Sequence, residues 1–510
     1  MSATQEHETA VSEPREVPLN LTEAEFRAAG HALVDRIADL LSSIGDRKVA
    51  PNTTPSALRA KLGDPRLPEV GTPAGDLLDS IAPLLFENST FNGHPRFFGY
   101  ITASAAPIGI LADMLAAAVN PNCGAWSLSP AATEIERQAV GWVADFIGFP
   151  SSCGGLFVSG GNMANIVCFL AARTAYAARA GWDLRAKGLA AGEGAKLIVY
   201  TSAETHTWIE KAAEVSGLGT DAIRWIEVDD RRRMRMDRLE AQIAADRRAG
   251  LRPFLVIGTG GSVSTGAVDP LPEIARLCRA EGLWFHVDGA YGAPAAHVPG
   301  APATLTALGD ADSVAVDPHK WLYAPLEAGC ALVRDPEVLP ATFSHQPPYY
   351  HFHGTADDPP VNFFALGLQN SRGFRALKVW LGFRQIGRSG YSKLIAGDIA
   401  LARRMYDGID AHPELEALTL GLSITTFRYV PPDLDATMPA DEREEFLNAL
   451  NTALLTRLQE QGAIYLSNAV IDGRFVLRAC IVNFRTTAAD VDAVAEIVVR
   501  EGRILAAEGK

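Results

Sequence analysis

Short apolar runs alternate with longer amphipathic stretches through the middle of the chain. The runs predict strands at residues 156–159, 196–201, 224–228, 253–258, 283–287, 313–316 and 330–333. Most are separated by stretches with apolar residues at helical spacing, such as 163–180 and 271–280. This alternation predicts an α/β fold with a mostly parallel central sheet and helices on both faces. Ligands of such sheets bind at the carboxyl ends of the strands.

The pattern changes towards both ends of the chain. Residues 1–20 are polar and acidic and predict a disordered tail. Thr22 and Glu25 form a capping box that opens a helical segment, residues 21–85, interrupted by Pro-rich turns. This segment is too small and too broken to bury its own apolar face, so we expect it to pack on the main body or on a second subunit. Two further domains are expected, a large one and a smaller α+β one, at residues 86–380 and 381–510.

Composition narrows the class of protein. A chain of 510 residues is too long for one hydrophobic core, which agrees with several domains. The net charge of -14, with no long run of Lys or Arg, argues against nucleic acid and membrane surfaces as partners. No apolar run reaches membrane-spanning length, and the N-terminus lacks a signal-peptide pattern. The six cysteines form no C-x-x-C pair, which indicates reduced thiols in a soluble cytoplasmic protein and no zinc site.

A glycine-rich turn follows the first predicted strand, in L-F-V-S-G-G-N-M-A-N at residues 156–165. The backbone N–H groups of such a turn and the dipole of the helix after it suit a phosphate. The stretch is neither G-x-G-x-x-G nor a P-loop, so dinucleotides and nucleoside triphosphates lack their signatures. An ordinary strand-to-helix turn remains the alternative.

Chemically active side chains stand at the ends of other predicted strands. Asp288 ends the apolar run L-W-F-H-V-D, where a buried carboxylate needs a partner; a helix N-cap or a core hydrogen bond is the structural alternative. His206 follows a strand in S-A-E-T-H-T-W, and lone histidines are more often structural than catalytic. Lys320, in D-S-V-A-V-D-P-H-K-W-L-Y, stands at the mouth of a buried strand, where it either keeps a costly charge or uses its amine.

Together these features match the needs of pyridoxal phosphate. That cofactor requires a lysine for its Schiff base, an acid opposite the pyridine nitrogen and a site for its phosphate. We therefore expect Lys320 to act through its amine. A nicotinamide-dependent oxidoreductase lacks its fingerprint and leaves Lys320 unexplained. A catalytically silent dimeric scaffold is disfavoured because Lys320, Asp288 and His206 are all present.

The same residues resemble the group II pyridoxal-phosphate-dependent amino acid decarboxylases, the family of aromatic-L-amino-acid, histidine and glutamate decarboxylases. The likeness lies in D-P-H-K-W, H-V-D-G-A-Y and S-A-E-T-H, with H-P-R-F-F-G-Y at 94–100, S-P-A-A-T-E-I-E at 129–136 and S-R-G-F-R-A-L-K-V-W at 371–380. It runs in order from about residue 20 to the end. The resemblance implies a fold-type I, aspartate aminotransferase-like architecture and a homodimer in which residues 21–85 wrap the partner.

Carried over position by position, the resemblance implies roles for individual residues. Lys320 forms the Schiff base, Asp288 pairs with the pyridinium and His206 stacks on the ring. The other implied cofactor contacts are Ala290 beneath the ring and, around the phosphate, Gly161, Asn162, Ser262 and His319. The implied reaction is loss of CO2 from Cα of an L-amino acid, which releases an amine.

One departure from the family pattern concerns the product. Many members carry, on a mobile loop, a Tyr that protonates the substrate carbon. Counted back from S-R-G-F-R, that position is Phe363 here. Members with Phe there can react further with O2 and release an aldehyde, ammonia and peroxide. Alternatively, Tyr349 or Tyr350 supplies the proton.

A second departure concerns the substrate pocket. Two positions that are commonly aromatic in aromatic decarboxylases correspond to Asn92 and Gly124. Phe97, Phe98 and Tyr100 are candidates for an apolar wall, or else for the core. No Arg or Lys stands out as a clamp for an acidic side chain. We therefore expect an aromatic L-amino acid as substrate.

Overall fold

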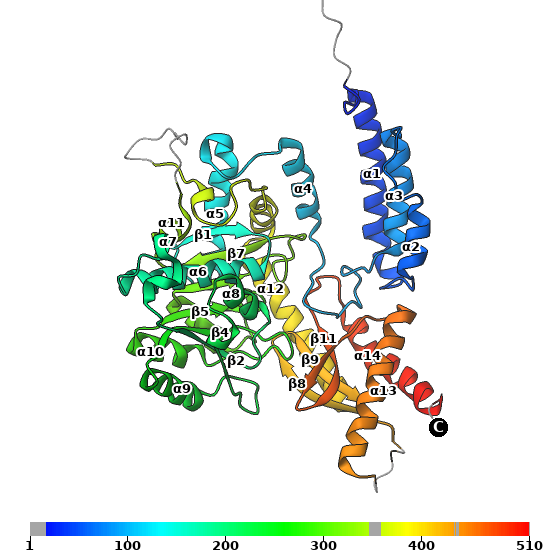
Figure 1. The fold of residues 1–510 in the computed structure, drawn as a ribbon. Coiled ribbons are helices and arrows are strands. Elements are labelled where there is room, and N and C mark those ends of the chain that lie inside the picture. The colour runs from blue at the N-terminus through cyan, green and yellow to red at the C-terminus, as the bar shows by residue number, and fades with distance from the viewer. Residues whose placement is uncertain (1–16, 346–358, 433, 435–437, 509–510) are drawn as a thin grey trace, which may run out of the picture. The chain divides into compact units, whose positions relative to one another are not determined.

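A computed structural model describes residues 17–345, 359–432, 434 and 438–508 (Figure 1). The described residues form two compact units, one within Met1–Arg47 and Pro51–Thr90, the other within Lys48–Ala50 and Phe91–Lys510. Most of the tail that we predict to be disordered, residues 1–16, lies outside the described residues. Within the described part of the chain, no helix is long and apolar enough to cross a membrane.

The N-terminal unit is helical. It contains α1 (Glu23–Ser43), the 3-10 turn η1 (Ile44–Asp46), α2 (Pro55–Leu62) and α3 (Ala74–Asn88). α1 begins at the predicted capping box, in which the Thr22 hydroxyl accepts from the Glu25 N–H at 3.2 Å. Of the described side chains, none in α1 and only Ala82 in α3 is buried. The unit therefore leaves most of its apolar side chains exposed.

The second unit contains a seven-stranded sheet. Its strands are β1 (Gly154–Val158), β2 (Leu197–Ser202), β3 (Ile223–Ile226), β4 (Arg252–Thr259), β5 (Trp284–Asp288), β6 (Ser313–Val316) and β7 (Gly329–Val333). The order is β1-β7-β6-β5-β4-β2-β3; β7 is antiparallel to both neighbours and the remaining pairs are parallel. The predicted α/β class with a mostly parallel sheet is confirmed.

Successive residues of a strand face opposite sides of the sheet, and both sides are buried. In β2, Ile198 and Tyr200 join one hydrophobic core, whereas Leu197 and Val199 join the other. The helices packed on the second core are α6 (Gly161–Arg179) and α8 (Trp208–Val215). Those packed on the first are α5 (Pro130–Ile147), α9 (Met236–Arg248), α10 (Leu271–Glu281) and the first part of α12 (Ala376–Asp410).

A smaller antiparallel sheet follows α12 in the chain (Figure 1). It has the order β10-β11-β9-β8, and its strands are β8 (Leu415–Gly421), β9 (Ile424–Tyr429), β10 (Ser467–Ile471) and β11 (Arg474–Cys480). It packs with α13 (Ala440–Gln461) and α14 (Ala488–Glu508) around a third core. The expected domain boundary after residue 380 falls inside α12, whose helical geometry breaks at Gly387 (φ 62°).

Short elements complete the second unit. They are α4 (Pro107–Val119), α7 (Leu184–Lys187), α11 (Val338–Phe343) and the 3-10 turns η2 (Trp126–Leu128), η3 (Gly188–Gly192), η4 (Thr220–Ala222), η5 (Ala293–Ala295), η6 (Ala303–Asp310) and η7 (Phe363–Ala365). The carboxyl ends of β2, β4, β5 and β6 meet at one edge of the main sheet, because these strands are parallel. β1 also ends there, since β1 and β6 are both antiparallel to β7.

Candidate active site

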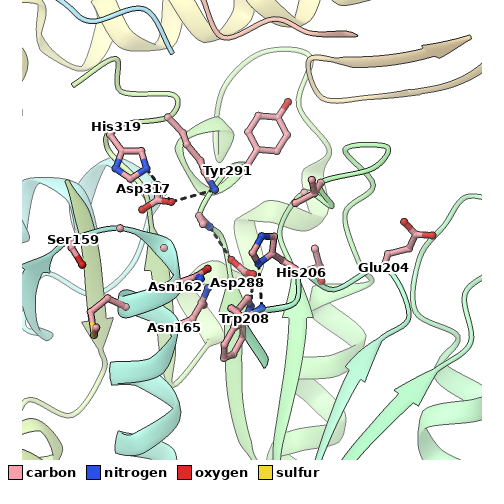
Figure 2. Close-up of a pocket in the computed structure, with 18 residues that line it drawn as sticks. Ser159, Asn162, Asn165, Glu204, His206, Trp208, Asp288, Tyr291, Asp317 and His319 are labelled. Carbon is pink, nitrogen blue, oxygen red and sulfur yellow. Dashed lines mark hydrogen bonds and ion pairs between the residues drawn. The ribbon is translucent and has the colours of Figure 1, made fainter. Parts of the chain in front are cut away.

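A cavity of about 330 Å³ lies at this edge of the sheet (Figure 2). A volume of this size is at the lower end of the range for small-molecule sites. The predicted residues that line the cavity are Gly161, Asn162, His206, Asp288, Ala290, His319 and Lys320. The fold therefore brings together side chains from the loops after β1, β2, β5 and β6.

The glycine turn after β1 meets the cavity at the N-terminus of α6. Gly160 has φ 141°, a conformation that favours glycine, and Gly161 begins the helix. A Cβ on Gly161 would lie 2.6 Å from Asp317 Oδ2 and 3.1 Å from the Ala290 Cβ, so no side chain fits there. The first N–H groups of a helix lack intrahelical acceptors and favour an anion. The turn is therefore suited to a phosphate group.

The loop after β6 presents the lysine amine. Lys320 Nζ lies 3.2 Å from Asp317 Oδ2, and His319 Nε2 lies 3.5 Å from the same oxygen. His319 Nδ1 accepts from the Ala328 N–H at 3.0 Å, and burial lowers the pKa of this histidine. Among the described residues, Asp317 Oδ1 has no hydrogen-bond partner. The amine therefore stands beside a buried carboxylate that is only half satisfied.

Asp288 and His206 share one neighbour, Trp208. The Trp208 indole N–H donates to Asp288 Oδ2 at 2.7 Å, and Asp288 Oδ1 accepts from the Ala290 N–H at 3.3 Å. The Trp208 backbone N–H donates to His206 Nδ1 at 3.2 Å. Burial lowers the pKa of His206. Sequence reasoning missed Trp208, because its contact to Asp288 joins residues that are far apart in the chain.

A buried network ties β5 to α6 behind the cavity. His286 Nε2 lies 2.8 Å from Asn165 Oδ1, and His286 Nδ1 lies 2.9 Å from the Ser313 hydroxyl. The Trp284 indole N–H also donates to the Ser313 hydroxyl, at 2.9 Å. Burial lowers the pKa of His286 to about 4, so the ring is neutral at pH 7. The network therefore fixes the strand that carries Asp288 against the helix that carries Gly161.

The loop that carries Lys320 is anchored from α12. Asp398 Oδ2 accepts from the Trp321 indole N–H at 2.8 Å and from the Tyr323 hydroxyl at 2.7 Å. Burial raises the pKa of Asp398 to about 7. The Trp321 ring stacks on Tyr291 with centroids 4.8 Å apart. Trp321 is thus held by a hydrogen bond to α12 and by stacking on Tyr291, and Tyr323 is held by a hydrogen bond to the same carboxylate.

Some predicted site residues lie elsewhere. Ser262 does not line the described cavity; its hydroxyl is 3.0 Å from the Thr265 hydroxyl, inside its own loop. Phe98 is fully buried in the core of the smaller domain, and Phe97 stacks on Tyr465 with centroids 5.1 Å apart. Tyr100 is exposed and does not line the described cavity. The core alternative therefore describes Phe97 and Phe98 better than an apolar wall of the cavity.

The two departures from the family pattern have physical reasons in the fold. Phe363 is 2% exposed in the core that holds α6, and the Arg372 guanidinium lies 4.9 Å from its ring centre. A Cβ on Gly124 would lie 2.2 Å from the Asn370 carbonyl oxygen, so an aromatic side chain does not fit there. Tyr349 and Tyr350 lie outside the described residues.

Two further motif segments meet in a buried ion pair. Arg372 donates to Glu136 Oε1 at 2.5 Å and to the Phe157 carbonyl at 2.6 Å. The Glu136 carboxylate also accepts from the Phe157 N–H at 2.9 Å. S-P-A-A-T-E-I-E and S-R-G-F-R thus clamp β1, whose end forms the phosphate turn. Their contribution to the site is structural.

Arg478 is a buried cation that sequence reasoning also missed. Its guanidinium donates to the carbonyls of Val263 and Tyr100, at 2.6 and 3.0 Å, and to the Ser467 hydroxyl at 3.0 Å. In the part of the chain that the structure describes, Nη2 has no hydrogen-bond partner. Val263 lines the cavity. An arginine inside the apolar strand F-V-L-R-A-C was the available signal.

The geometry defines a class of protein. A lysine amine, a fixed carboxylate, an imidazole and a glycine turn at a helix N-terminus line one cavity. These are the groups that pyridoxal phosphate needs, for its aldehyde, ring nitrogen, ring face and phosphate respectively. The residues present therefore fit this cofactor, and the fold and site are those of a pyridoxal-phosphate enzyme.

The comparisons with known proteins identify the family. The model of the pyridoxal-dependent decarboxylase conserved domain matches residues 55–430. The chain is 34% identical over 470 residues to an aromatic-L-amino-acid decarboxylase of Bacillus atrophaeus (92% of this chain, 94% of the relative). It is 30% identical over 468 residues to a phenylacetaldehyde synthase of a Rosa hybrid cultivar (90% of each). The structure of Oryza sativa TDC with PLP and tryptamine matches with a TM-score of 0.87 at 28% identity (96% of this chain, 100% of that chain).

The chain therefore belongs to the pyridoxal-dependent decarboxylase family. The predicted family and cofactor are confirmed, and the protein is a pyridoxal-phosphate-dependent carboxy-lyase of amino acids. The matched relatives include both decarboxylases and aldehyde synthases.

Proposed function

We propose that the chain converts an aromatic L-amino acid and a proton into the corresponding amine and CO2. The observation that carries this proposal is the cavity that joins Lys320, Asp288 and His206 to the N-terminus of α6. Bound pyridoxal phosphate supplies an electron sink for the carbon that loses CO2. The similarity to an aromatic-L-amino-acid decarboxylase supports this choice of substrate.

Each residue of the cavity has a distinct task in this proposal. Gly161 and Asn162 at the start of α6 bind the phosphate, and Asp288 accepts the N–H of the protonated pyridine nitrogen. His206 would cover one face of the ring and Ala290 would support the other, since both residues line the cavity. Lys320 would hold the cofactor through its amine, which lies 3.2 Å from Asp317 Oδ2 and can hold a proton there. Ser262 and His319 remain predicted phosphate contacts, although the Ser262 hydroxyl is occupied within its loop.

Arg478 is the cation best placed to hold the substrate carboxylate. It is buried, it is hydrogen-bonded to neutral acceptors, and Nη2 has no partner in the described residues. A buried, unpaired cation is costly, so a site that retains one gains by binding an anion. The adjacent Val263 backbone connects it to the cavity wall.

The second candidate is an aldehyde synthase, which the similarity to a phenylacetaldehyde synthase favours. Its balanced reaction consumes the amino acid, O2 and water, and it yields the aldehyde, CO2, ammonia and H2O2. Phe363 is the sequence feature that suggests it. Because Phe363 is buried and is not among the residues that line the described cavity, the amine remains the first proposal.

We also propose a homodimer. α1 and α3 expose apolar side chains, among them Phe26, Val34, Leu77 and Leu85. α4, in the second unit, exposes Leu111, Met114, Leu115 and Val119. Apolar surfaces of this kind mark sites of association. Sedimentation of the purified protein should give twice the mass of the chain, and a monomer would contradict the proposal.

The decisive experiment measures CO2 release from a panel of carboxyl-labelled L-amino acids, with peroxide recorded in the same wells. CO2 without peroxide from one aromatic substrate is the expected result. CO2 with equimolar peroxide would establish the aldehyde synthase. No CO2 from any amino acid would contradict both candidates.

A further inference from the structure

Trp208 contacts both side chains that the proposed function assigns to the cofactor ring. Its indole N–H donates to Asp288 Oδ2 at 2.7 Å, and its backbone N–H donates to His206 Nδ1 at 3.2 Å. The ring is 1% exposed and lies edge-on against Phe169 and His286. Figure 2 shows Trp208, Asp288 and His206 grouped together. Trp208 is thus a rigid donor, held by packing on both sides.

The two carboxylate oxygens of Asp288 differ in the strength of their hydrogen bonds. Oδ2 is held by a short hydrogen bond, and a bond to an ionised carboxylate is roughly twice as strong as a neutral one. Oδ1 accepts a long bond of 3.3 Å from the Ala290 N–H. The indole therefore resists rotation of the carboxylate, and Oδ1 is the oxygen left to accept from a ring N–H.

The backbone bond selects one form of His206. An imidazole nitrogen that accepts a hydrogen bond carries no proton, and His206 Nδ1 accepts from the Trp208 N–H, so the ring is neutral. A neutral imidazole has one donor and one acceptor nitrogen. Because Nδ1 accepts from the Trp208 N–H, the proton is on Nε2.

We propose that Trp208 is a positioning residue for the cofactor ring. It fixes Asp288 so that Oδ1 receives the N–H of the pyridine nitrogen, and it holds His206 as the Nε2–H tautomer. The inference rests on the proposed function, because it requires the cavity to bind pyridoxal phosphate. It also explains why a large indole is buried in the first turn of α8, at the end of S-A-E-T-H-T-W.

The test compares two ligands of the apoenzyme, pyridoxal 5′-phosphate and its 1-deaza analogue, in which carbon replaces the ring nitrogen. Their dissociation constants are measured by titration calorimetry. Trp208→Phe should weaken binding of pyridoxal phosphate about tenfold, because a hydrogen bond to a charged acceptor is lost. Binding of the analogue, which offers Asp288 no N–H, should change little. The preference for pyridoxal phosphate should therefore fall about tenfold.

Trp284→Phe is the matched control. Trp284 is also a buried indole, but its N–H donates to the Ser313 hydroxyl at 2.9 Å. This variant disturbs the network behind the cavity but breaks no bond to Asp288 or His206, so it should weaken both ligands alike and keep the preference between them. If Trp208→Phe weakens the binding of both ligands equally, or changes the binding of neither, the positioning role is wrong.

A second substitution covers the case in which Trp208→Phe does not fold. 3-Benzothienylalanine at position 208 has the shape of tryptophan with sulfur in place of the N–H, and the same loss of preference is expected. If the wild-type apoenzyme binds neither ligand, the proposed function fails instead. The two failures are therefore distinguishable.

Discussion

Two buried clusters of charge in the second unit differ in how fully their hydrogen-bonding groups are used. Arg372 and Glu136 each have side chains that are 1% exposed, and backbone groups of Phe157 complete their bonds. Around Lys320, by contrast, Asp317 Oδ1 has no partner in the described residues, and Asp288 Oδ1 accepts a long bond. Both clusters come from equally distinctive motifs. Saturated bonds indicate a structural cluster, and unfilled ones indicate a cluster built to receive a ligand.

The largest expected effect is the loss of activity on removal of the amine. Lys320→Ala should lower kcat/KM at least about 10³-fold, equivalent to about 4 kcal/mol, because no other amine in the cavity can carry the cofactor. The variant should also lose its bound cofactor, which the absorbance of the purified protein checks. Lys378→Ala is the control, since this buried lysine has partners in Asp113 and the Pro325 carbonyl. It should lose stability and keep its bound cofactor. If Lys320→Ala kept its cofactor and Lys378→Ala lost it, the contrast between a ligand-binding lysine and a structural lysine would be wrong.

The next effect falls on stability. Glu136→Gln leaves the Arg372 charge buried without a counter-ion, which should cost about 3–5 kcal/mol of unfolding free energy. Denaturant titration measures this cost, and activity per folded molecule should be retained. Asp145→Asn breaks a pair with Arg388 whose side chains are 52% and 67% exposed, and it should cost under about 1 kcal/mol. If both variants lost the same unfolding free energy, fully used hydrogen-bonding groups would not mark a structural cluster.

Asp398 shares a property with each cluster. Its Oδ2 accepts two hydrogen bonds, as in the structural cluster, but its carboxyl group changes its protonation state near pH 7. Its pKa in the folded protein, about 7, lies above the ordinary value of 3.8. Below pH 4 the carboxyl group is protonated in both the folded and the unfolded chain, so its contribution to the free energy of unfolding is complete. As the pH rises from 4 through 7, the unfolded chain loses this proton first, and the contribution is lost. The wild-type protein should therefore lose about 1 kcal/mol per pH unit between pH 5 and 7, relative to Asp398→Asn. Denaturant titrations at several pH values check the slope. A constant difference would mean that Asp398 is ionised in the fold.

The smallest effect is expected at Phe363. A tyrosine there adds a hydroxyl to a packed core, which should cost about 1 kcal/mol of stability. The ratio of peroxide to CO2 should stay that of the wild-type protein, because Phe363 packs under Arg372. A change in that ratio would place residue 363 in the path of the proton or of O2, and would favour the aldehyde-synthase pattern.

The strands and most of the cavity residues could be predicted from local pattern. Most strands of the main sheet are apolar runs because both of their faces are buried, whereas the edge strand β3 contains Arg224 and the exposed Trp225. The carboxyl ends of parallel strands share one edge, so Lys320, Asp288, His206 and Gly161 were expected to meet there. Ser262 stays a prediction: its hydroxyl bonds within its own loop, which a local pattern did not reveal, because a hydroxyl in a glycine-rich loop can satisfy its own turn as readily as a ligand.

The sequence by itself determined the α/β class, the family and the position of Lys320 at the end of a strand, since apolar periodicity and short motifs are local properties. The tertiary structure decided which charged side chains have partners for all their hydrogen-bonding groups, because these partners come from distant segments of the chain. Trp208 meets Asp288, Arg478 meets Val263 and Glu136 meets Arg372 only after folding. Such pairs depend on how strands and helices pack, and no local pattern encodes them.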